Sequence, residues 1–284
     1  MRTKTKIWFI VAAFLVIIGC VMFGGVMMKL KWDFSKLSTS KYVTNTYEIE
    51  EEFQKICVQA DTADITFRKA EDGICKVVCV EHESEKHETE VKDGTLSIQL
   101  QDERKWFEHI GINVGTSKIT VFLPQGFMFL SVDVLTSTGD IVMKKIETGR
   151  LNLSVSTGKI TVESVKCEGD VKLKVTTGNS FLTDVQCKNL STTGNTGEIT
   201  MKSVVAEEQI DIKRSTGDVS FEKVDALDIV VKVSTGDVKG SLLSEKVFVT
   251  KTSTGSVYVP KTTNGGTCKI ETSTGDIKIS IEKE

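Results

Sequence analysis

The chain has 284 residues, of which 39% are hydrophobic and 26% charged, and its net charge is −3. This length allows one or two domains, and the abundance of valine, isoleucine and threonine favours β-strands. Arg2, Lys4, Lys6, Lys29 and Lys31 all precede the first acidic residue, so the remainder of the chain is more acidic than the whole. An acidic body argues against nucleic-acid binding, because that affinity depends on neutralising phosphates.

The N-terminus contains one apolar segment, residues 7–28, with the sequence IWFIVAAFLVIIGCVMFGGVMM and no charge. At about 1.5 Å per residue, a helix of this length spans the hydrocarbon core of a bilayer. The basic residues before it place the N-terminus in the cytoplasm. We therefore expect residues 1–31 to be a cytoplasmic tip and a transmembrane signal anchor, with the C-terminal domain outside the cytoplasm. Two alternatives stay open: cleavage as a secretory signal, and lipidation at Cys20 within the sequence IIGC.

Two segments separate this helix from the C-terminal part. Residues 32–46 are polar and rich in serine and threonine, which is typical of a juxtamembrane linker. Residues 47–135 contain irregularly spaced strand patterns such as KICVQA, KVVCVEH and KITVFLP. We expect them to form an irregular β lead-in that caps the first edge of the domain. At the other end, the charged sequence IEKE is expected to protect the last strand from further pairing.

Residues 136–284 repeat the motif Ser-Thr-Gly-Asp followed by an apolar residue. STGD begins at positions 137, 215, 234 and 273, the looser copies STGK, TTGN, NTGE and STGS lie between them, and the motif glycines are 19 or 20 residues apart. The flanking segments, such as LNLSV and VKLKV, alternate apolar and polar residues as half-buried strands do. One such unit cannot bury its apolar face alone. The repeat therefore predicts an all-β fold, a single-chain β-solenoid (β-helix) of about 19–20 residues per coil.

Each motif is expected to form one corner of a coil, with a second, less regular bend elsewhere. Glycine accepts positive φ without a steric penalty, and the threonine before it is expected to satisfy backbone groups at the bend. The alternative for the threonines is a flat exposed array that binds an ordered surface such as ice or glycan. The predicted corner residues are Gly139, Gly158, Gly178, Gly197, Gly217, Gly236, Gly255 and Gly275, and Thr138, Thr157, Thr177, Thr196, Thr216, Thr235, Thr254 and Thr274.

The lead-in contains a weak candidate for a metal site, Cys75, Cys79, His82 and His87. Two thiolates and two imidazoles are ligands that zinc prefers. On a strand, however, the two cysteines face one side and His82 the other, and the spacing is not that of a zinc ribbon. We therefore expect two core cysteines and two solvated histidines, with no metal and no cofactor.

The repeat is expected to stack two further sets of residues, one above another, in successive coils. Cys167 and Cys187 each lie nine residues after a motif glycine, so they are expected to stack in adjacent coils. Neighbouring strands are close enough for a disulfide, and two small buried thiols are the alternative. The aspartates after the motif glycines are interpreted as solvated surface rather than a calcium site, because Lys159, Asn179 and Ser256 interrupt their column.

Tandem [ST]-T-G-[DNEK]-[IV] motifs behind a single N-terminal span resemble the bacterial putative-adhesin family, β-strand-repeat domains of unknown function. They are also similar to the membrane-anchored LiaG-like proteins of Gram-positive bacteria. The resemblance covers roughly residues 45–284 and includes TADITF, a degenerate motif with Ala63 in place of the glycine, and KITVFLPQG. It implies an envelope-exposed β-solenoid and brings no catalytic residues.

The sequence thus predicts a non-enzymatic β-solenoid, anchored in the cell membrane by a single pass, that acts as an adhesin or cell-envelope scaffold. Its expected ligand is a protein or a glycan, and its oligomeric state is left open. The alternative is an accessory or regulatory protein of an envelope-stress system that contacts a partner membrane protein. No G-x-S-x-G, phosphate-loop or H-E-x-x-H motif occurs. A polysaccharide-acting β-helix enzyme is supported by fold analogy alone.

Overall fold

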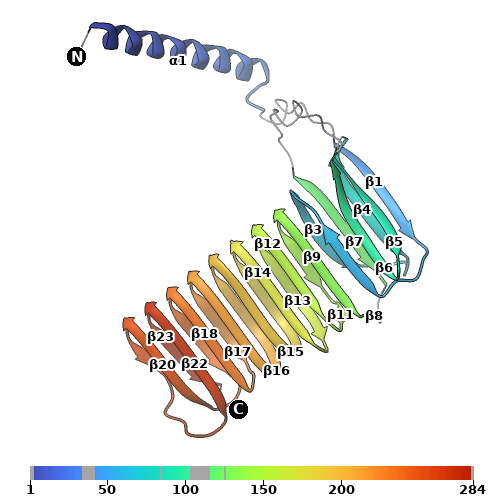
Figure 1. Ribbon diagram of the computed structural model, residues 1–284, viewed down its shortest axis with the longest axis vertical. Coiled ribbons are helices and arrows are strands. Elements are labelled where there is room, and N and C mark those ends of the chain that lie inside the picture. Colours follow the sequence, from blue (N-terminus) through green and yellow to red (C-terminus); the bar gives the residue numbers. More distant parts are fainter. Residues whose placement is uncertain (1–2, 34–41, 84, 103–115, 125, 283–284) are drawn as a thin grey trace. The chain divides into compact units, whose positions relative to one another are not determined.

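The computed structural model describes residues 3–33, 42–83, 85–102, 116–124 and 126–282. The chain divides into two compact units, residues 1–42 with 104–115, and residues 43–103 with 116–284. The helix α1 (Thr3–Lys29) belongs to the first unit (Figure 1). Its segment Lys6–Lys29 has a mean hydropathy of 2.7 and is long and apolar enough to cross a membrane. Most apolar side chains of this helix are exposed, Met27 being a buried exception, which is the pattern of a span rather than of a core helix.

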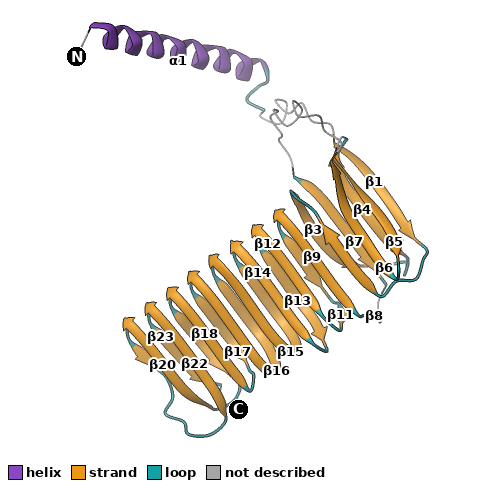
Figure 2. Cartoon of the chain, in the orientation of Figure 1, coloured by secondary structure: helices purple, strands orange, loops and turns teal. Residues whose placement is uncertain are grey.

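The second unit is built of strands stacked into coils (Figure 2). Strands on either side of each motif glycine pair in parallel with their counterparts in the next coil, as Ile141 does with Ile160, and Ile160 with Ser180. The prediction of an all-β, solenoid-like stack is confirmed. The strands of these regular coils are β9 (Ser131–Thr138), β10 (Ile141–Lys144), β11 (Glu147–Thr148), β12 (Leu151–Thr157), β13 (Ile160–Cys167), β14 (Asp170–Thr177), β15 (Ser180–Thr196), β16 (Ile199–Thr216), β17 (Val219–Val224), β18 (Asp228–Thr235) and β19 (Val238–Leu242).

The core runs along the inside of the stack. Alternate residues of each strand point inward, so that Leu151, Leu153 and Val155 before one corner and Ile160 and Val162 after it are all buried. The same positions of the neighbouring coils continue these columns. Each coil therefore buries its apolar face against the two coils beside it.

A second corner recurs six residues after the motif glycine. There the chain takes positive φ without a glycine, at a cost that the stacked neighbours must offset. The second bend is thus more regular than its varied sequence suggests. The residues concerned are Lys145, Ser164, Asp184, Ser203 and Lys223, with φ values from 51° to 56°.

The lead-in forms a cap of mixed pairing. Its strands β2 and β3 make the coil that precedes the regular ones, with Ile56 paired to Val132 and Ile65 to Ile141. Beyond this coil, β7 pairs in parallel with β3 and antiparallel with β4. The strands β5 and β6 form an antiparallel pair, and β1 pairs with β4. The strands of the cap are β1 (Tyr42–Ile49), β2 (Lys55–Gln59), β3 (Ala63–Lys69), β4 (Cys75–His82), β5 (Glu85–Lys92), β6 (Thr95–Asp102), β7 (Ser117–Leu123) and β8 (Met128–Phe129).

The order of the coils at the C-terminal end departs from the sequence order. The last strands, β22 (Gly266–Thr274) and β23 (Ile277–Ile281), lie between the coil of β18 and β19 and the coil of β20 (Lys246–Thr254) and β21 (Val257–Tyr258). Figure 1 shows β22 between β18 and β20. The expectation that the charged C-terminal segment protects an outermost strand is therefore wrong. β23 pairs on both sides, and β20 and β21 form the edge instead.

Candidate functional site

The motif glycines are required by close stacking at the corner. Gly236 has φ 151°, and a Cβ atom on it would lie 2.2 Å from the carbonyl oxygen of Gly217 in the preceding coil. The amide of Gly217 also donates to the carbonyl of Thr235 over 2.9 Å. A side chain is therefore excluded both by conformation and by space. This arrangement repeats along the stack and has a structural role.

The aspartate of the motif has a structural role that the sequence interpretation missed. Asp218 Oδ1 accepts a hydrogen bond from the amide of Asp237 over 2.9 Å, and Asp237 Oδ1 accepts one from the amide of Asp276 over 2.8 Å. The Oδ1 of Asn179 makes the same contact with the amide of Glu198. The interpretation of this column as mere solvated surface is wrong. Asn179, which shares the acceptor oxygen but not the charge, was the signal for it.

The motif threonines form an exposed ladder. They are in register from coil to coil, as in the pairs Thr157 with Thr177 and Thr235 with Thr274, and all eight are exposed. Hydroxyl bonds to the bend come instead from residues three before the glycine, for example Thr136 Oγ1 to the carbonyl of Thr138 over 3.2 Å. Among the described residues, none of the eight hydroxyls makes such a bond. The expectation that they satisfy the bend is wrong, and the alternative of an exposed hydroxyl array gains weight.

A buried arginine lies beside this ladder. Arg214 is 3% exposed and occupies a core position between coils. Its Nη1 donates to the carbonyl of Val175 over 2.8 Å, and its Nη2 reaches Ser180 Oγ at 3.5 Å. Ser180 and Gly194 replace apolar residues of their columns, and a Cβ atom on Gly194 would lie 2.2 Å from Arg214 Nη1. Ser180 and Gly194 therefore make room for the side chain of Arg214.

The charge of Arg214 has no carboxylate partner within the described residues. Its Nε is buried without a hydrogen bond, and burial lowers the pKa of its guanidinium below the ordinary value. A buried cation without a counter-charge is costly to fold. Such a residue therefore points to a role outside the packing of the core.

Arg214 and Gly194 line an open groove, which we call the arginine groove. The outward positions of the strands beside it carry a row of exposed lysines, in which Lys213 pairs with Lys232 in the next coil. Lys232 and Lys251 lie close enough to Glu271 to lower the pKa of its carboxyl, after the larger effect of its hydrogen bond to Lys269. The groove is lined by Lys174, Thr176, Thr193, Gly194, Asn195, Lys213, Arg214, Ser215, Lys232, Val233, Ser234, Lys251, Ser253, Glu271, Thr272 and Ser273.

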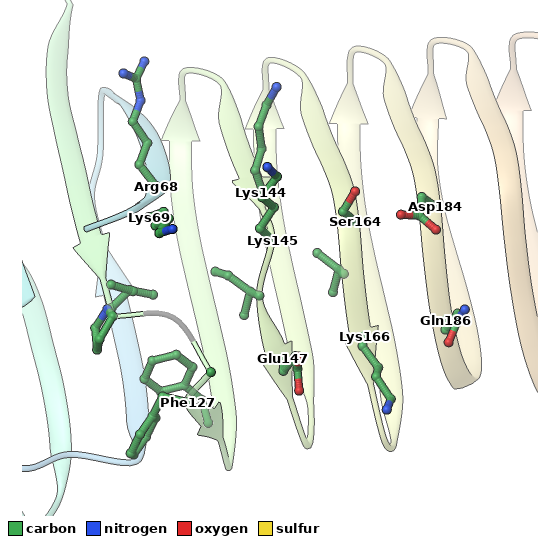
Figure 3. Close-up of a pocket in the computed structure, with 16 residues that line it drawn as sticks. Arg68, Lys69, Phe127, Lys144, Lys145, Glu147, Ser164, Lys166, Asp184 and Gln186 are labelled. Carbon is green, nitrogen blue, oxygen red and sulfur yellow. The ribbon is translucent and has the colours of Figure 1, made fainter. Parts of the chain in front are cut away.

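A second basic pocket lies where the cap meets the regular coils (Figure 3). It has a volume of about 400 Å³ and combines Arg68, Lys144 and Lys166 with the ring of Phe127. In Figure 3 the side chains of Arg68 and Lys144 extend toward the top of the view, and those of Lys166 and Glu147 toward the bottom. Lys144 is also held by Glu163 over 2.6 Å. The charged ends do not converge, so this pocket is a weaker candidate than the arginine groove.

Of the four predicted metal-ligand candidates, the structure brings Cys79 and His87 together, within 4.8 Å of each other, and Cys75 and His82 are not part of this cluster. Cys75 and Cys79 point into the cap, and His82 lies on the other face of β4, as expected. His87 was expected to be solvated, and this is wrong: it is 2% exposed. Its Nδ1 lies 2.6 Å from the Oε2 of Glu81, a residue that the sequence analysis did not select.

The charges of this cluster affect one another. Burial alone would raise the pKa of Glu81, but hydrogen bonds from His87 and Asn45 outweigh it, and the net effect is a pKa below the ordinary value. Burial, with a smaller effect from Glu81, raises the pKa of Cys79 to about 12. Glu81 is thus a buried carboxylate beside a neutral thiol.

Cys167 and Cys187 are both buried, and the adjoining residues Lys166 and Gln186 are paired in neighbouring coils. In the structure both are free thiols. Burial raises the pKa of each, and that of Cys187 reaches about 12.

By its fold, the protein is a solenoid-like stack of β-coils that follows an N-terminal apolar helix in the sequence. The family model described as Toastrack DUF4097 matches residues 53–284, so the chain belongs to this family. The predicted membership of a family of β-strand-repeat domains of unknown function is confirmed by this family model. A comparison with curated proteins finds no match.

Two solved structures illustrate the likeness. A putative lipid binding protein from Parabacteroides distasonis ATCC 8503 is 18% identical, with a TM-score of 0.54 over 84% of this chain and 97% of that chain. A putative adhesin from Bacteroides fragilis NCTC 9343 is 16% identical, with a TM-score of 0.44 over 84% and 97%. The first of these shows a shared fold, and neither is named as an enzyme.

Proposed function

We propose that the chain is a non-enzymatic adhesin or envelope scaffold, anchored by α1, whose coils lie outside the cytoplasm and bind an anionic envelope polymer. The observation that carries this proposal is Arg214, a cation buried without a carboxylate partner in the lining of an open groove. Exposed lysines and the hydroxyls of the serines that precede the motif threonines, such as Ser215 and Ser234, continue this surface along the stack. A polymer with regularly spaced phosphates or carboxylates would meet the same groups coil after coil.

The chemistry of the groove favours an anion over a neutral ligand. The uncompensated charge of the buried Arg214 attracts an anion electrostatically. The exposed lysines of the groove can donate charge-assisted hydrogen bonds to a phosphate or carboxylate, and such bonds are roughly twice as strong as neutral ones. The lysines contribute long-range attraction that salt screens. The net charge of the whole chain is negative, so the attraction is local to this face.

Binding by the full-length protein in detergent tests the proposal, with a poly(glycerol phosphate) polymer as probe and uncharged dextran as control. Arg214→Met should weaken binding by about ten-fold or more while leaving stability unchanged or higher, because a buried unpaired charge is removed. Lys213→Gln should weaken binding less. Lys202→Gln is the matched control on the same strand, since Lys202 lies after the corner and is paired with Glu222 over 2.7 Å.

The outcomes distinguish the proposal from its rivals. Equal binding of dextran and the anionic polymer, or no effect of Arg214→Met, would contradict the groove as the site. The topology is tested on intact cells, where an added protease should remove the domain that follows α1. Replacing residues 7–28 by an unrelated span should leave binding intact. Loss of cellular function in that variant, with the domain still displayed, would favour the accessory role at a partner membrane protein.

A further inference from the structure

The inside of the cap contains a cluster of three different metal ligands. Cys79, Glu81 and His87 are all buried, and one ligand atom from each lies within 4.8 Å of the others. Cys79 and Glu81 point inward from β4, and His87 points inward from β5 across the turn that joins the two strands. Neither the corner motif nor the proposed polymer groove uses these residues.

The hydrogen bonds of the cluster are incomplete. Glu81 Oε1 accepts from Asn45 Nδ2 over 2.7 Å, and Glu81 Oε2 accepts from the amide of His87 over 2.7 Å as well as contacting its Nδ1. The second ring nitrogen, His87 Nε2, is buried with no partner. A buried polar atom without a partner costs free energy. The contact of His87 Nδ1 with Glu81 must offset this cost.

We propose that Cys79, Glu81 and His87 form a structural zinc site inside the cap. A thiolate, a carboxylate and a neutral imidazole are ligands of Zn²⁺, and together with the ion they carry no net charge. Without metal, Cys79 is a neutral thiol beside the buried Glu81 carboxylate. Binding of the ion therefore displaces the thiol proton, because zinc takes cysteine as the thiolate.

The geometry requires only a small adjustment. Zinc binds sulfur at about 2.3 Å and nitrogen or oxygen at about 2.0–2.2 Å, so ligand atoms on one ion are about 3.3–3.6 Å apart. The ligand atoms lie within 4.8 Å of one another, so the longest separation would contract by at most about 1.5 Å, and the 2.6 Å contact between His87 Nδ1 and Glu81 Oε2 would open by less than about 1 Å. A shift of this size is within the reach of side-chain rotation. A water molecule is suited to the fourth position, which these three residues leave open.

The edge strand provides a route for the ion. β1 pairs only with β4 among the described strands, and it supplies the Asn45 side chain that covers Glu81. Local opening of an edge strand costs less than opening the stack. Metal binding should in turn hold β1 against β4, so zinc would stabilise the cap end of the stack.

The test uses the full-length protein in detergent, stripped of metal and titrated with Zn²⁺. We expect one equivalent to bind with release of the Cys79 thiol proton, and Co²⁺ to give the charge-transfer absorption of a cobalt–thiolate bond. Cys79→Ser and His87→Gln should weaken binding by about 100-fold or more, while Cys75→Ser, on the same face of β4, should bind as the parent does. Hydrogen exchange of β1 should slow when zinc is added.

The measurements on the parent protein stand even if a variant fails to fold. Absence of stoichiometric binding, or Co²⁺ spectra without a thiolate band, would overturn the proposal. The cluster would then be a buried, hydrogen-bonded pair of Glu81 and His87 beside a thiol, and zinc would leave exchange in β1 unchanged. Loss of binding in Cys75→Ser as well would also contradict this ligand set. Polymer binding at the arginine groove should be the same with and without zinc, so either proposal can fail alone.

Discussion

The regular coils and the two ends of the stack bury their backbones in different ways. In the coils, one residue type serves one purpose at each position: a glycine permits the corner, an aspartate oxygen accepts the next amide, and apolar columns fill the core. The cap instead mixes parallel and antiparallel pairs and places Glu81 and His87 inside. At the C-terminal end, the last strand pair in the sequence is inserted between the two coils that precede it, so that β22 pairs with both β18 and β20. A repeat can thus specify the interior of a stack, but each end needs its own solution, because an end has a neighbour on one side only.

Disulfide cross-links can test the order of the coils at the C-terminal end. Val230 pairs with Lys269, and Lys269 pairs with Val249, all on the outward side of their strands. Val230→Cys with Lys269→Cys should form a disulfide, since neighbouring strands are about 4.8 Å apart. Val230→Cys with Val249→Cys should not, because two steps of the stack are about 10 Å. Mass spectrometry after mild oxidation gives an all-or-none answer, and the reverse result would restore the sequence order.

A glycine substitution compares a corner of the coils with a turn of the cap. Gly236→Ala places a Cβ atom 2.2 Å from a backbone oxygen, so we expect a loss on the order of 3 kcal/mol or more. Gly73→Ala meets no atom within 4 Å, and its φ of 75° alone should cost about 1 kcal/mol. Denaturant unfolding of both variants measures the difference. Equal losses would mean that conformation alone, and not close stacking, requires the corner glycine.

The corners and the alternating strands could be predicted because they are local and repeated. The order of the last coils could not, since the strands ending at Thr254 and Thr274 share the same motif and alternation. Either one can pair with the strand that ends at Thr235. Parallel register is set by these patterns, which are the same for both orders. A repetitive sequence therefore specifies the register of strand pairing better than it specifies which coils are neighbours.

The candidate sites were harder to predict because their contacts join distant positions. Arg214 contacts Val175 and Ser180, which lie two coils away. The only sequence signal was that Ser180, Gly194 and Arg214 all depart from apolar columns. His87 lies in the irregular lead-in, where no repeat indicates which face is inward. The sequence predicted Ala63 as a degenerate corner. It lies directly against Gly139 because the residues between them fold into the cap, which the spacing alone does not predict.

The aspartate ladder gives a smaller and more selective prediction. Asp237→Ala removes the acceptor for the amide of Asp276 and should cost about 1 kcal/mol. Asp237→Asn keeps an acceptor oxygen at the same place and should stay within about 0.5 kcal/mol of the parent. Hydrogen exchange at the amide of Asp276 should rise only in the alanine variant. A larger loss in the asparagine variant, or a calcium-dependent melting temperature in the parent, would instead make this column a cation site.

The reactivity of the cysteine thiols compares the cap with the coils, and it requires the smallest change to the protein. Only the thiolate reacts with an alkylating reagent, and at pH 8 a thiol with a pKa of about 12, as in Cys187 and Cys268, is ionised to only about one part in ten thousand. Cys57 is partly exposed, and its pKa is raised mainly by burial and further by Asp133. Outside α1, Cys57 should therefore react first in the folded protein, with a rate that rises with pH to beyond the ordinary thiol pKa.

Two comparisons complete this measurement. Asp133→Asn removes a negative charge that opposes ionisation of Cys57, so it should speed the reaction at a fixed pH. Unfolding should make the buried thiols reactive, including Cys167 and Cys187, which are free in the structure. Two thiols that stay blocked until a reductant is added would identify a disulfide between those coils. If Cys187 reacted as fast as Cys57 without denaturant, the coils would open more readily than the cap, which is the reverse of what their regular stacking predicts.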